Sequence, residues 1–73
     1  MIEVRFFATL RDGRGKVAEI PAEGISTAGD LFRRFEIQAE AVSILLINGF
    51  HSKPEDSVKD GDVVSLFPPV GGG

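Results

Sequence analysis

The stretch TAGDLFRRFE, residues 27–36, decides the fold, because it has helical spacing and lies between segments that alternate like strands. Apolar residues recur on one side of it at spacings of three and four: Ala28, Leu31, Phe32 and Phe35. Thr27, with Asp30 three residues later, resembles a capping box. The pattern therefore predicts an amphipathic helix that begins after Thr27 and ends near Phe35 or Glu36.

Two alternating segments precede this helix. In residues 2–9 the apolar side chains of Ile2, Val4, Phe6 and Ala8 point one way, as in a strand with one buried face. Residues 16–20 alternate again and stop before Pro21. Asp12-Gly13 between them is a turn signal, so we expect a hairpin.

Three further strands are predicted after the helix. Residues 43–48, SILLIN, form an almost continuous apolar run, typical of a strand that is central or buried on both faces. Asn48-Gly49 predicts a tight turn into a short strand at 50–53. Residues 62–67, DVVSLF, form the last strand, which two prolines end.

The predicted order is β-β-α-β-β-β, which places the chain in the α+β class. A hairpin, one main helix across the sheet and further strands make the β-grasp, or ubiquitin-like, arrangement, with a mixed sheet of four to five strands. A right-handed crossover through the helix would leave the first and last strands central and parallel. We expect one domain at residues 1–69 and a flexible C-terminal Gly-Gly tail at 70–73.

Composition excludes most kinds of catalytic site. The chain has no cysteine and one histidine, so disulfides, thiolate metal sites and a cysteine nucleophile are excluded, and His51 alone makes no metal site. No glycine-rich loop joins a strand to a helix, so the sequence indicates no loop that would bind a nucleotide. The net charge of −3 argues against nucleic acid, and no apolar run reaches a membrane span. We expect a cytoplasmic protein that is not an enzyme.

The final residues are the anomaly of the sequence. Gly71, Gly72 and Gly73 follow Phe67-Pro68-Pro69-Val70. The prolines stiffen the base of this segment, and the glycines leave its tip without Cβ atoms. Such a tip suits insertion of a bare carboxylate into a narrow slot on another protein. An idle or artificial end is the alternative.

Several of these motifs together resemble the MoaD/ThiS ubiquitin-like sulfur-carrier family, which includes the small subunit of molybdopterin synthase and the thiamine sulfur carrier. They are Phe6-Phe7-Ala8, the helix cap, Asn48-Gly49, Asp60-Gly61-Asp62 and the C-terminal FPPVGGG of residues 67–73. The resemblance spans the whole chain. Phe-Pro-Pro-Val is similar to the molybdopterin type, whereas Val-Gly-Gly-Gly is closer to the thiamine type.

The resemblance implies a mechanism and its partners. An E1-like adenylyltransferase of the MoeB/ThiF type would use ATP and Mg²⁺ to adenylate Gly73, and this chain would bind no cofactor itself. A cysteine desulfurase or rhodanese-like protein would then supply sulfur, leaving a thiocarboxylate. A large synthase subunit or a thiazole synthase would receive the sulfur. Molybdopterin biosynthesis is the first expectation and thiamine thiazole biosynthesis the second; a protein modifier or a non-covalent interaction module are the rivals.

The same resemblance assigns roles to residues. Gly73 would hold the adenylate and then the sulfur, and Gly72, Gly71 and Val70 would enter the partner's active site. The expected partner-binding surface consists of Phe7, Phe67, Pro68, Pro69 and His51.

Overall fold

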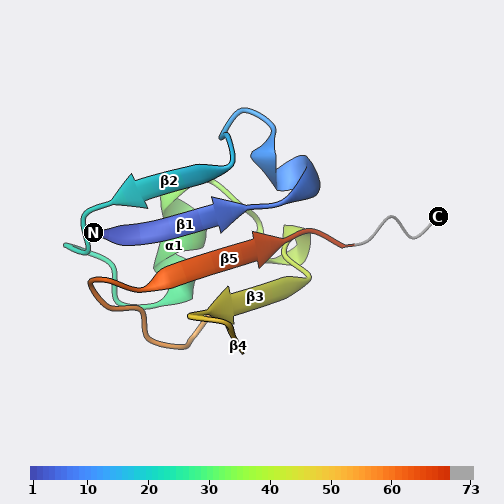
Figure 1. Ribbon diagram of the computed structural model, residues 1–73. Coiled ribbons are helices and arrows are strands. Elements are labelled where there is room, and N and C mark those ends of the chain that lie inside the picture. Colours follow the sequence, from blue (N-terminus) through green and yellow to red (C-terminus); the bar gives the residue numbers. More distant parts are fainter. Residues whose placement is uncertain (70–73) are drawn as a thin grey trace.

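The computed structural model describes residues 1–69 as a mixed five-stranded sheet with an α-helix on one face (Figure 1). The elements are β1 (Ile2–Phe6), β2 (Val17–Ile20), α1 (Ala28–Arg34), β3 (Ile44–Ile47), β4 (Phe50–His51) and β5 (Val63–Phe67). Across the sheet the order is β2-β1-β5-β3-β4. Only the central pair, β1 and β5, is parallel among the described strands. The predicted β-grasp with a central parallel pair is confirmed.

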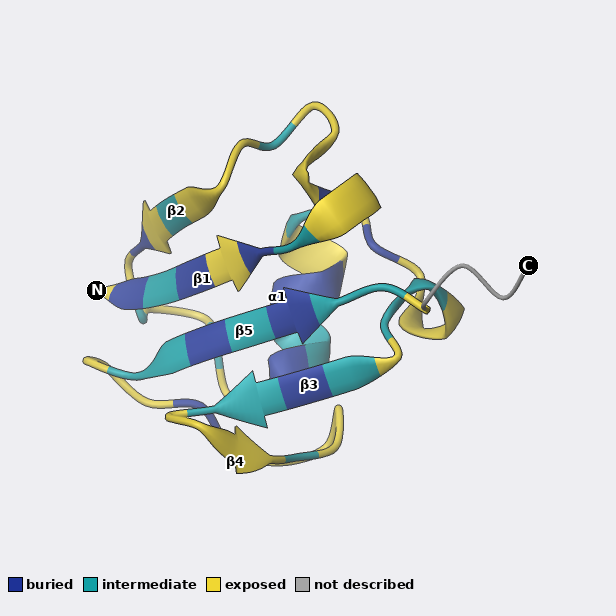
Figure 2. Ribbon diagram, turned by 45° about the vertical axis from the view of Figure 1, so that its right-hand side comes forward, coloured by how far each residue is buried: buried dark blue, intermediate teal, exposed yellow. Residues whose placement is uncertain are grey.

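The core lies between α1 and the face of the sheet that the helix covers (Figure 2). Register puts alternate residues of neighbouring strands on this face, as Val4 pairs with Val64 and Leu45 pairs with Leu66. From the helix, Leu31 and Phe32 are buried against them. In residues 1–69 no helix covers the opposite face, which we call the open face.

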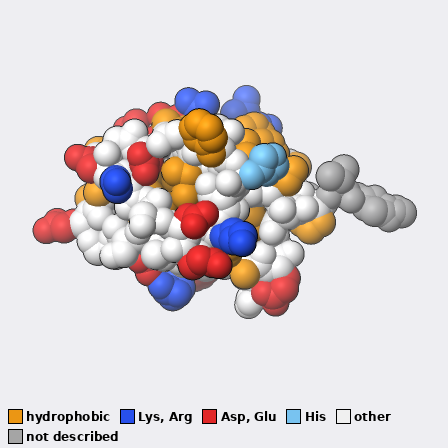
Figure 3. All heavy atoms as spheres, turned by 90° about the horizontal axis from the view of Figure 1, so that it is seen from below, with side chains coloured by type: hydrophobic (Ala, Val, Ile, Leu, Met, Phe, Trp, Pro, Cys, Tyr) orange, Lys and Arg blue, Asp and Glu red, His pale blue; other side chains and the backbone are white. Residues whose placement is uncertain are grey.

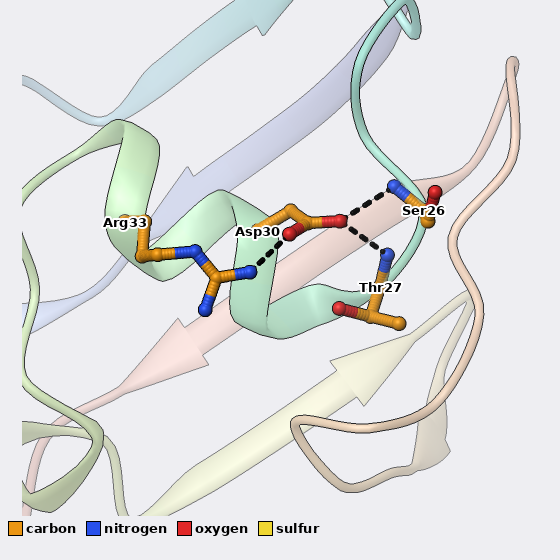
Figure 4. Close-up of polar contacts among 4 residues, drawn as sticks. All are labelled: Ser26, Thr27, Asp30 and Arg33. Carbon is orange, nitrogen blue, oxygen red and sulfur yellow. Dashed lines mark hydrogen bonds and ion pairs between the residues drawn. The ribbon is translucent and has the colours of Figure 1, made fainter.

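The start of α1 is held by the predicted capping box (Figure 4). One carboxylate oxygen of Asp30 accepts hydrogen bonds from the backbone N–H groups of Ser26, at 2.8 Å, and Thr27, at 3.0 Å. The other oxygen pairs with Arg33. These contacts, with Ser26 first, lower the pKa of Asp30. Glu36, with φ of +57°, follows the end of the helix.

The first strand is shorter than predicted. It ends at Phe6 rather than Thr9, and residues Ala8–Arg11 form a 3₁₀-helix that we call η1. The cause is the backbone of Ala8, whose φ of +52° lies in the left-handed region and turns the chain out of the sheet. The alternation through Ala8 gave no sign of this turn.

Of the two alternatives predicted for residues 43–48, the structure confirms a strand inside the sheet and not one that is buried on both faces. β3 lies inside the sheet, between β5 and β4, but only Leu45 among its residues is buried. Ile44 and Leu46 point to the open face, where they are half-buried. A short 3₁₀-helix, Ala39–Ala41, also precedes β3 and was not predicted.

Two turn motifs meet at the start of β5. The Asn48 side chain donates a hydrogen bond to Asp62 at 2.9 Å and accepts one from the Val63 N–H at 2.9 Å. Asp62 also accepts from the Lys59 N–H, at 2.8 Å. The hydrogen bond from Asn48, followed by that from Lys59, lowers the pKa of Asp62. Asn48-Gly49 and Asp60-Gly61-Asp62 are therefore structural motifs that fix the start of β5.

Residues 70–73, the predicted flexible tail, lie outside the described residues, and the boundary after residue 69 stays a prediction. Within residues 1–69, no helix has the length and apolar character needed to cross a membrane.

Candidate partner-binding groove

The open face is apolar at the end where β1 and β5 finish. Alternation places Phe7 beyond β1 and Phe67 at the end of β5 on this face, and Ile44 pairs with Phe67 from β3. Because β1 and β5 are parallel, their carboxyl ends meet at one edge of the sheet. Two of the predicted contact residues, far apart in the sequence, are thus brought together.

Phe7 and Phe67 form a direct stack. Their ring centroids are 4.1 Å apart and their planes differ by 10°. Both side chains remain half-buried. Phe7 is therefore neither a core residue nor a freely exposed aromatic, because it is half-buried and its ring stacks on that of Phe67.

The stack borders an open groove of about 360 Å³. Its lining is almost entirely apolar and consists of Phe7, Ala8, Thr9, Ile44, Phe67, Pro68 and Pro69. Pro69 is exposed, and Val70 follows it directly in the sequence. The predicted contact residues Phe7, Phe67, Pro68 and Pro69 thus form one surface at the base of the glycine-containing segment.

A guanidinium lies beside this groove. The Arg11 guanidinium carbon is 5.5 Å from the centroid of the Phe7 ring, within cation–π range. Its Nε donates a hydrogen bond to the Phe6 carbonyl at 2.9 Å. Arg11 thus contacts Phe7, and Phe7 stacks on Phe67, so the three side chains extend from η1 to the end of β5.

His51 is not part of the groove. It is exposed on β4 and pairs with Leu46, so it points to the open face on the edge strand. Figure 3 shows the histidine on the surface, with hydrophobic side chains beside it. Its neighbour Phe50 is 75% exposed.

The described lining of the groove contains no titratable side chain. In residues 1–69 no group of three or more His, Cys, Asp or Glu side chains is placed to hold a metal ion. The carboxylates with shifted pKa values, Asp30, Asp60 and Asp62, take part in helix-cap, N-terminal and turn contacts. None of them lines the groove.

Sequence reasoning missed part of the lining and the adjacent cation. The sequence places Ile44 in a strand that is central or buried on both faces, and Arg11 beside a turn. Ala8 and Thr9 were assigned to β1. The periodicity of residues 43–48 does not show which face of the strand is covered. The place of Arg11 beside Phe7 depends on η1, which the sequence pattern did not indicate.

Comparison with known proteins now decides the family. Residues 4–73 match the model of the ThiS family. The chain belongs to the ThiS family. This is a family of small ubiquitin-like carriers and modifiers, and the match covers both the groove and the final glycines.

Relatives of the chain agree with membership of the ThiS family. The small archaeal modifier protein 3 of Haloferax volcanii is 33% identical over 90 aligned positions, which cover 99% of this chain and 98% of the relative. The H. volcanii protein HVO 2177, solved in solution, has a TM-score of 0.78 at 30% identity, covering 99% of this chain and 85% of that one.

A third likeness is to a chain in the complex of subunits 1 and 2 of the molybdopterin-converting factor from Helicobacter pylori. The TM-score is 0.64 at 29% identity, and the alignment covers 99% of this chain and 97% of that chain.

Proposed function

We propose that this chain is a sulfur carrier whose Gly73 carboxylate is activated by ATP on a partner enzyme and converted to a thiocarboxylate. The observation that supports this most directly is the apolar groove whose lining ends at Pro68 and Pro69, next to the glycine-containing segment. An activating enzyme that accepts the glycines must contact this end of the sheet. The groove provides apolar area for that contact.

The chemistry explains why the partner supplies the catalysis. A carboxylate is a poor electrophile, because its leaving group would be oxide. Attack of the Gly73 carboxylate on the α-phosphate of ATP would release pyrophosphate and leave an acyl-adenylate. A persulfide sulfur would then displace AMP, and a thiol would cleave the resulting S–S bond to free the thiocarboxylate. ATP and Mg²⁺ belong to the partner in this scheme, with Mg²⁺ offsetting the phosphate charge.

Transfer to a molybdopterin precursor is the acceptor step that we put first. It is supported by the Phe67-Pro68-Pro69-Val70 segment and by the likeness to the H. pylori complex of subunits 1 and 2. By analogy, a large synthase subunit would bind the groove. A thiazole synthase of thiamine biosynthesis is the alternative acceptor, supported by the ThiS family match.

Intact mass of the untagged protein from its native cells tests the proposal. Sulfur in place of one carboxylate oxygen adds about 16 Da, and fragmentation must place it on Gly73. A thiol-reactive probe separates this product from oxidation, which adds nearly the same mass. Only unmodified carboxylate, even after incubation with the activating enzyme, ATP and a sulfur donor, would rule out a carrier.

A protein modifier is the second candidate, because the relative from H. volcanii is named a modifier. The same adenylate would then be attacked by a lysine amine, giving an isopeptide bond. Lysine peptides bearing the C-terminal glycines in digests of native cells would favour this role. Thiocarboxylate without such conjugates would favour the carrier.

A further inference from the structure

The outer edge of β2 carries backbone groups that no strand of residues 1–69 covers. There β2 pairs with β1 alone, and Figures 1 and 2 show it as the outermost strand of the sheet. The Phe6 N–H donates a hydrogen bond to the Lys16 carbonyl at 2.9 Å, so Lys16 faces β1. Because this direction alternates along an antiparallel strand, Val17 and Glu19 direct their N–H and C=O groups outward. Such an edge can accept a further strand.

The opposite edge of the sheet is protected by its shortness. β4 has only two residues, Phe50–His51. The Ser52 N–H donates a hydrogen bond to the Leu45 carbonyl at 2.9 Å, so in β4 only His51 directs its backbone groups outward. Very short edge strands pair poorly with another chain. β2, which has four residues, is the edge that can receive an incoming strand.

The side chains of Val17 and Glu19 lie on the open face beside the β2 edge. Val17 is 52% exposed. Glu19 lies directly opposite Glu3 of β1, and like charges in this position repel each other. Arg5 pairs with Glu3, whereas Glu19 takes part in none of the ion pairs of residues 1–69. The edge therefore presents an apolar side chain and, two positions later, a negative charge that the described residues do not neutralise.

A second copy of β2 fits this edge badly. Antiparallel pairing about Ala18 would place Val17 of one copy opposite Glu19 of the other. The two Glu19 side chains would then be diagonal neighbours about 7–8 Å apart, on a surface that already holds Glu3. Pairing about Val17 would instead bring Glu19 against Gly15, whose φ of +90° is not extended. A positively charged partner would relieve the repulsion between Glu3 and Glu19.

We infer that β2 is a strand-addition site for an extended segment of a partner protein, with Lys or Arg opposite Glu19 and an apolar residue opposite Val17. Backbone hydrogen bonds to the outward groups of both residues would hold the segment, and their side chains would select it. Neither residue lines the groove, and the site makes no use of Gly73. The inference is therefore independent of the proposed function and adds a second binding surface to the chain.

A cyclised β-hairpin peptide tests the inference, because cyclisation removes most of the entropy cost of ordering a strand. The free edge of the hairpin carries Lys-Thr-Val, with the outward backbone groups on the lysine and the valine. A matched hairpin has glutamate in place of the lysine. Titration into the isotope-labelled full chain should shift the amide resonances of Val17 and Glu19. The lysine hairpin should bind about fivefold more tightly than the glutamate hairpin at about 50 mM salt.

Two variants separate the backbone contribution from the charge. Glu19→Lys should reverse the preference, so that the glutamate hairpin binds about fivefold more tightly. Val17→Pro removes one outward N–H without breaking a hydrogen bond to β1, and should raise Kd for both hairpins about fivefold or more. Glu55→Lys is the control, since it makes the same charge change on an exposed side chain outside β2. It should leave the preference for lysine in place.

The contrary outcomes are distinct. Amide resonances of Val17 and Glu19 that do not shift with either hairpin at about 5 mM overturn the inference. So does a preference that folded Glu19→Lys leaves unchanged, or that Glu55→Lys reverses to the same extent. If the wild type self-associates in sedimentation and Val17→Pro abolishes this, the occupant is a second copy, and the assignment to a basic segment is wrong. None of these results bears on adenylation of Gly73.

Discussion

Phe7 and Phe67 stack with their ring centroids 4.1 Å apart, although they lie sixty positions apart in the chain. The parallel pairing of β1 with β5 brings them together, since Phe6 pairs with Leu66 one residue before each. The fold thus creates the apolar surface that lies at the base of the final glycines. Truncation of either ring would remove the stacking contact of the other.

Phe7→Ala should impair partner binding far more than folding. Truncation removes one of the two aromatic rings that line the groove, so we expect KM for adenylation to rise about 10-fold or more. The free energy of unfolding should fall by about 1–2 kcal/mol, because Phe7 is only half-buried. Steady-state adenylation and thermal unfolding measure the two effects.

Phe50→Ala is the matched control for that variant. It makes the same chemical change at a residue that is 75% exposed on β4 and does not line the groove. We expect an unchanged KM. An equal rise in KM with Phe50→Ala would move the binding surface from the groove to the β4 edge.

Ala8 should respond to substitution according to backbone conformation alone. Its φ of +52° costs a non-glycine residue about 1–2 kcal/mol. Glycine avoids this cost, but the higher conformational entropy of its unfolded state offsets part of the gain in stability. We expect Ala8→Gly to be neutral or stabilising by about 1 kcal/mol. Ala8→Val should destabilise, because β-branched residues tolerate this region poorly. Urea denaturation measures the free energy of unfolding of both variants. Equal values for Ala8→Gly and Ala8→Val would contradict the left-handed turn.

Asp30 should make stability depend on acid pH. Hydrogen bonds from Ser26, Thr27 and Arg33 lower its pKa in the folded state. A lowered pKa gives stability that is present above the unfolded pKa of about 4 and is lost as pH falls through the folded value. We expect Asp30→Asn to lower Tm at pH 7 and to reduce the loss of Tm between about pH 5 and 2.

Glu55→Gln is the control for Asp30→Asn, because it removes the same charge from an exposed side chain outside the capping box. Its Tm should follow the wild type across the acid range. If Asp30→Asn follows the wild type as well, the hydrogen bonds of the capping box do not stabilise the charged carboxylate.

Neighbouring leucines of β3 should differ sharply. Leu45 is 5% exposed and faces α1, whereas Leu46 is half-buried on the open face. Leu45→Ala should cost about 2–5 kcal/mol, and Leu46→Ala less than about half of that. For a domain of this size the first loss approaches the whole stability. Denaturation midpoints measure both, and equal costs would mean that the open face is covered in solution.

The sequence predicted what depends on periodicity and turn chemistry. The spacing of Leu31 and Phe32 located α1, and the alternation before Asp12-Gly13 located the hairpin. The rule that crossover connections are right-handed then predicted β1 and β5 as central, parallel neighbours. Each of these features follows from local patterns and one topological rule.

What the sequence missed depends on tertiary contacts. Ala8 continues an alternating pattern, so its left-handed turn and η1 were invisible. The run around Leu45 is apolar on both sides of β3, but a single short helix covers only one. Phe7 and Phe67 were both predicted to contact partners, whereas their stacking and the place of Arg11 beside them required the fold.

Deletion of Gly72 and Gly73 should separate folding from function. Every buried hydrophobic residue in the described chain lies between Ile2 and Leu66, and glycines add no side chain to that core. We therefore expect an unchanged Tm and a complete loss of adenylation, because Gly73 would no longer supply the carboxylate. Gly73→Ala tests the steric part of the argument, since a Cβ at the tip must fit the partner's slot. A large loss of adenylation with Gly73→Ala would indicate a narrow slot, and a small loss one that tolerates a Cβ. Sulfur transfer that survives the deletion would show that the terminal glycines are idle and leave the groove as a plain interaction surface.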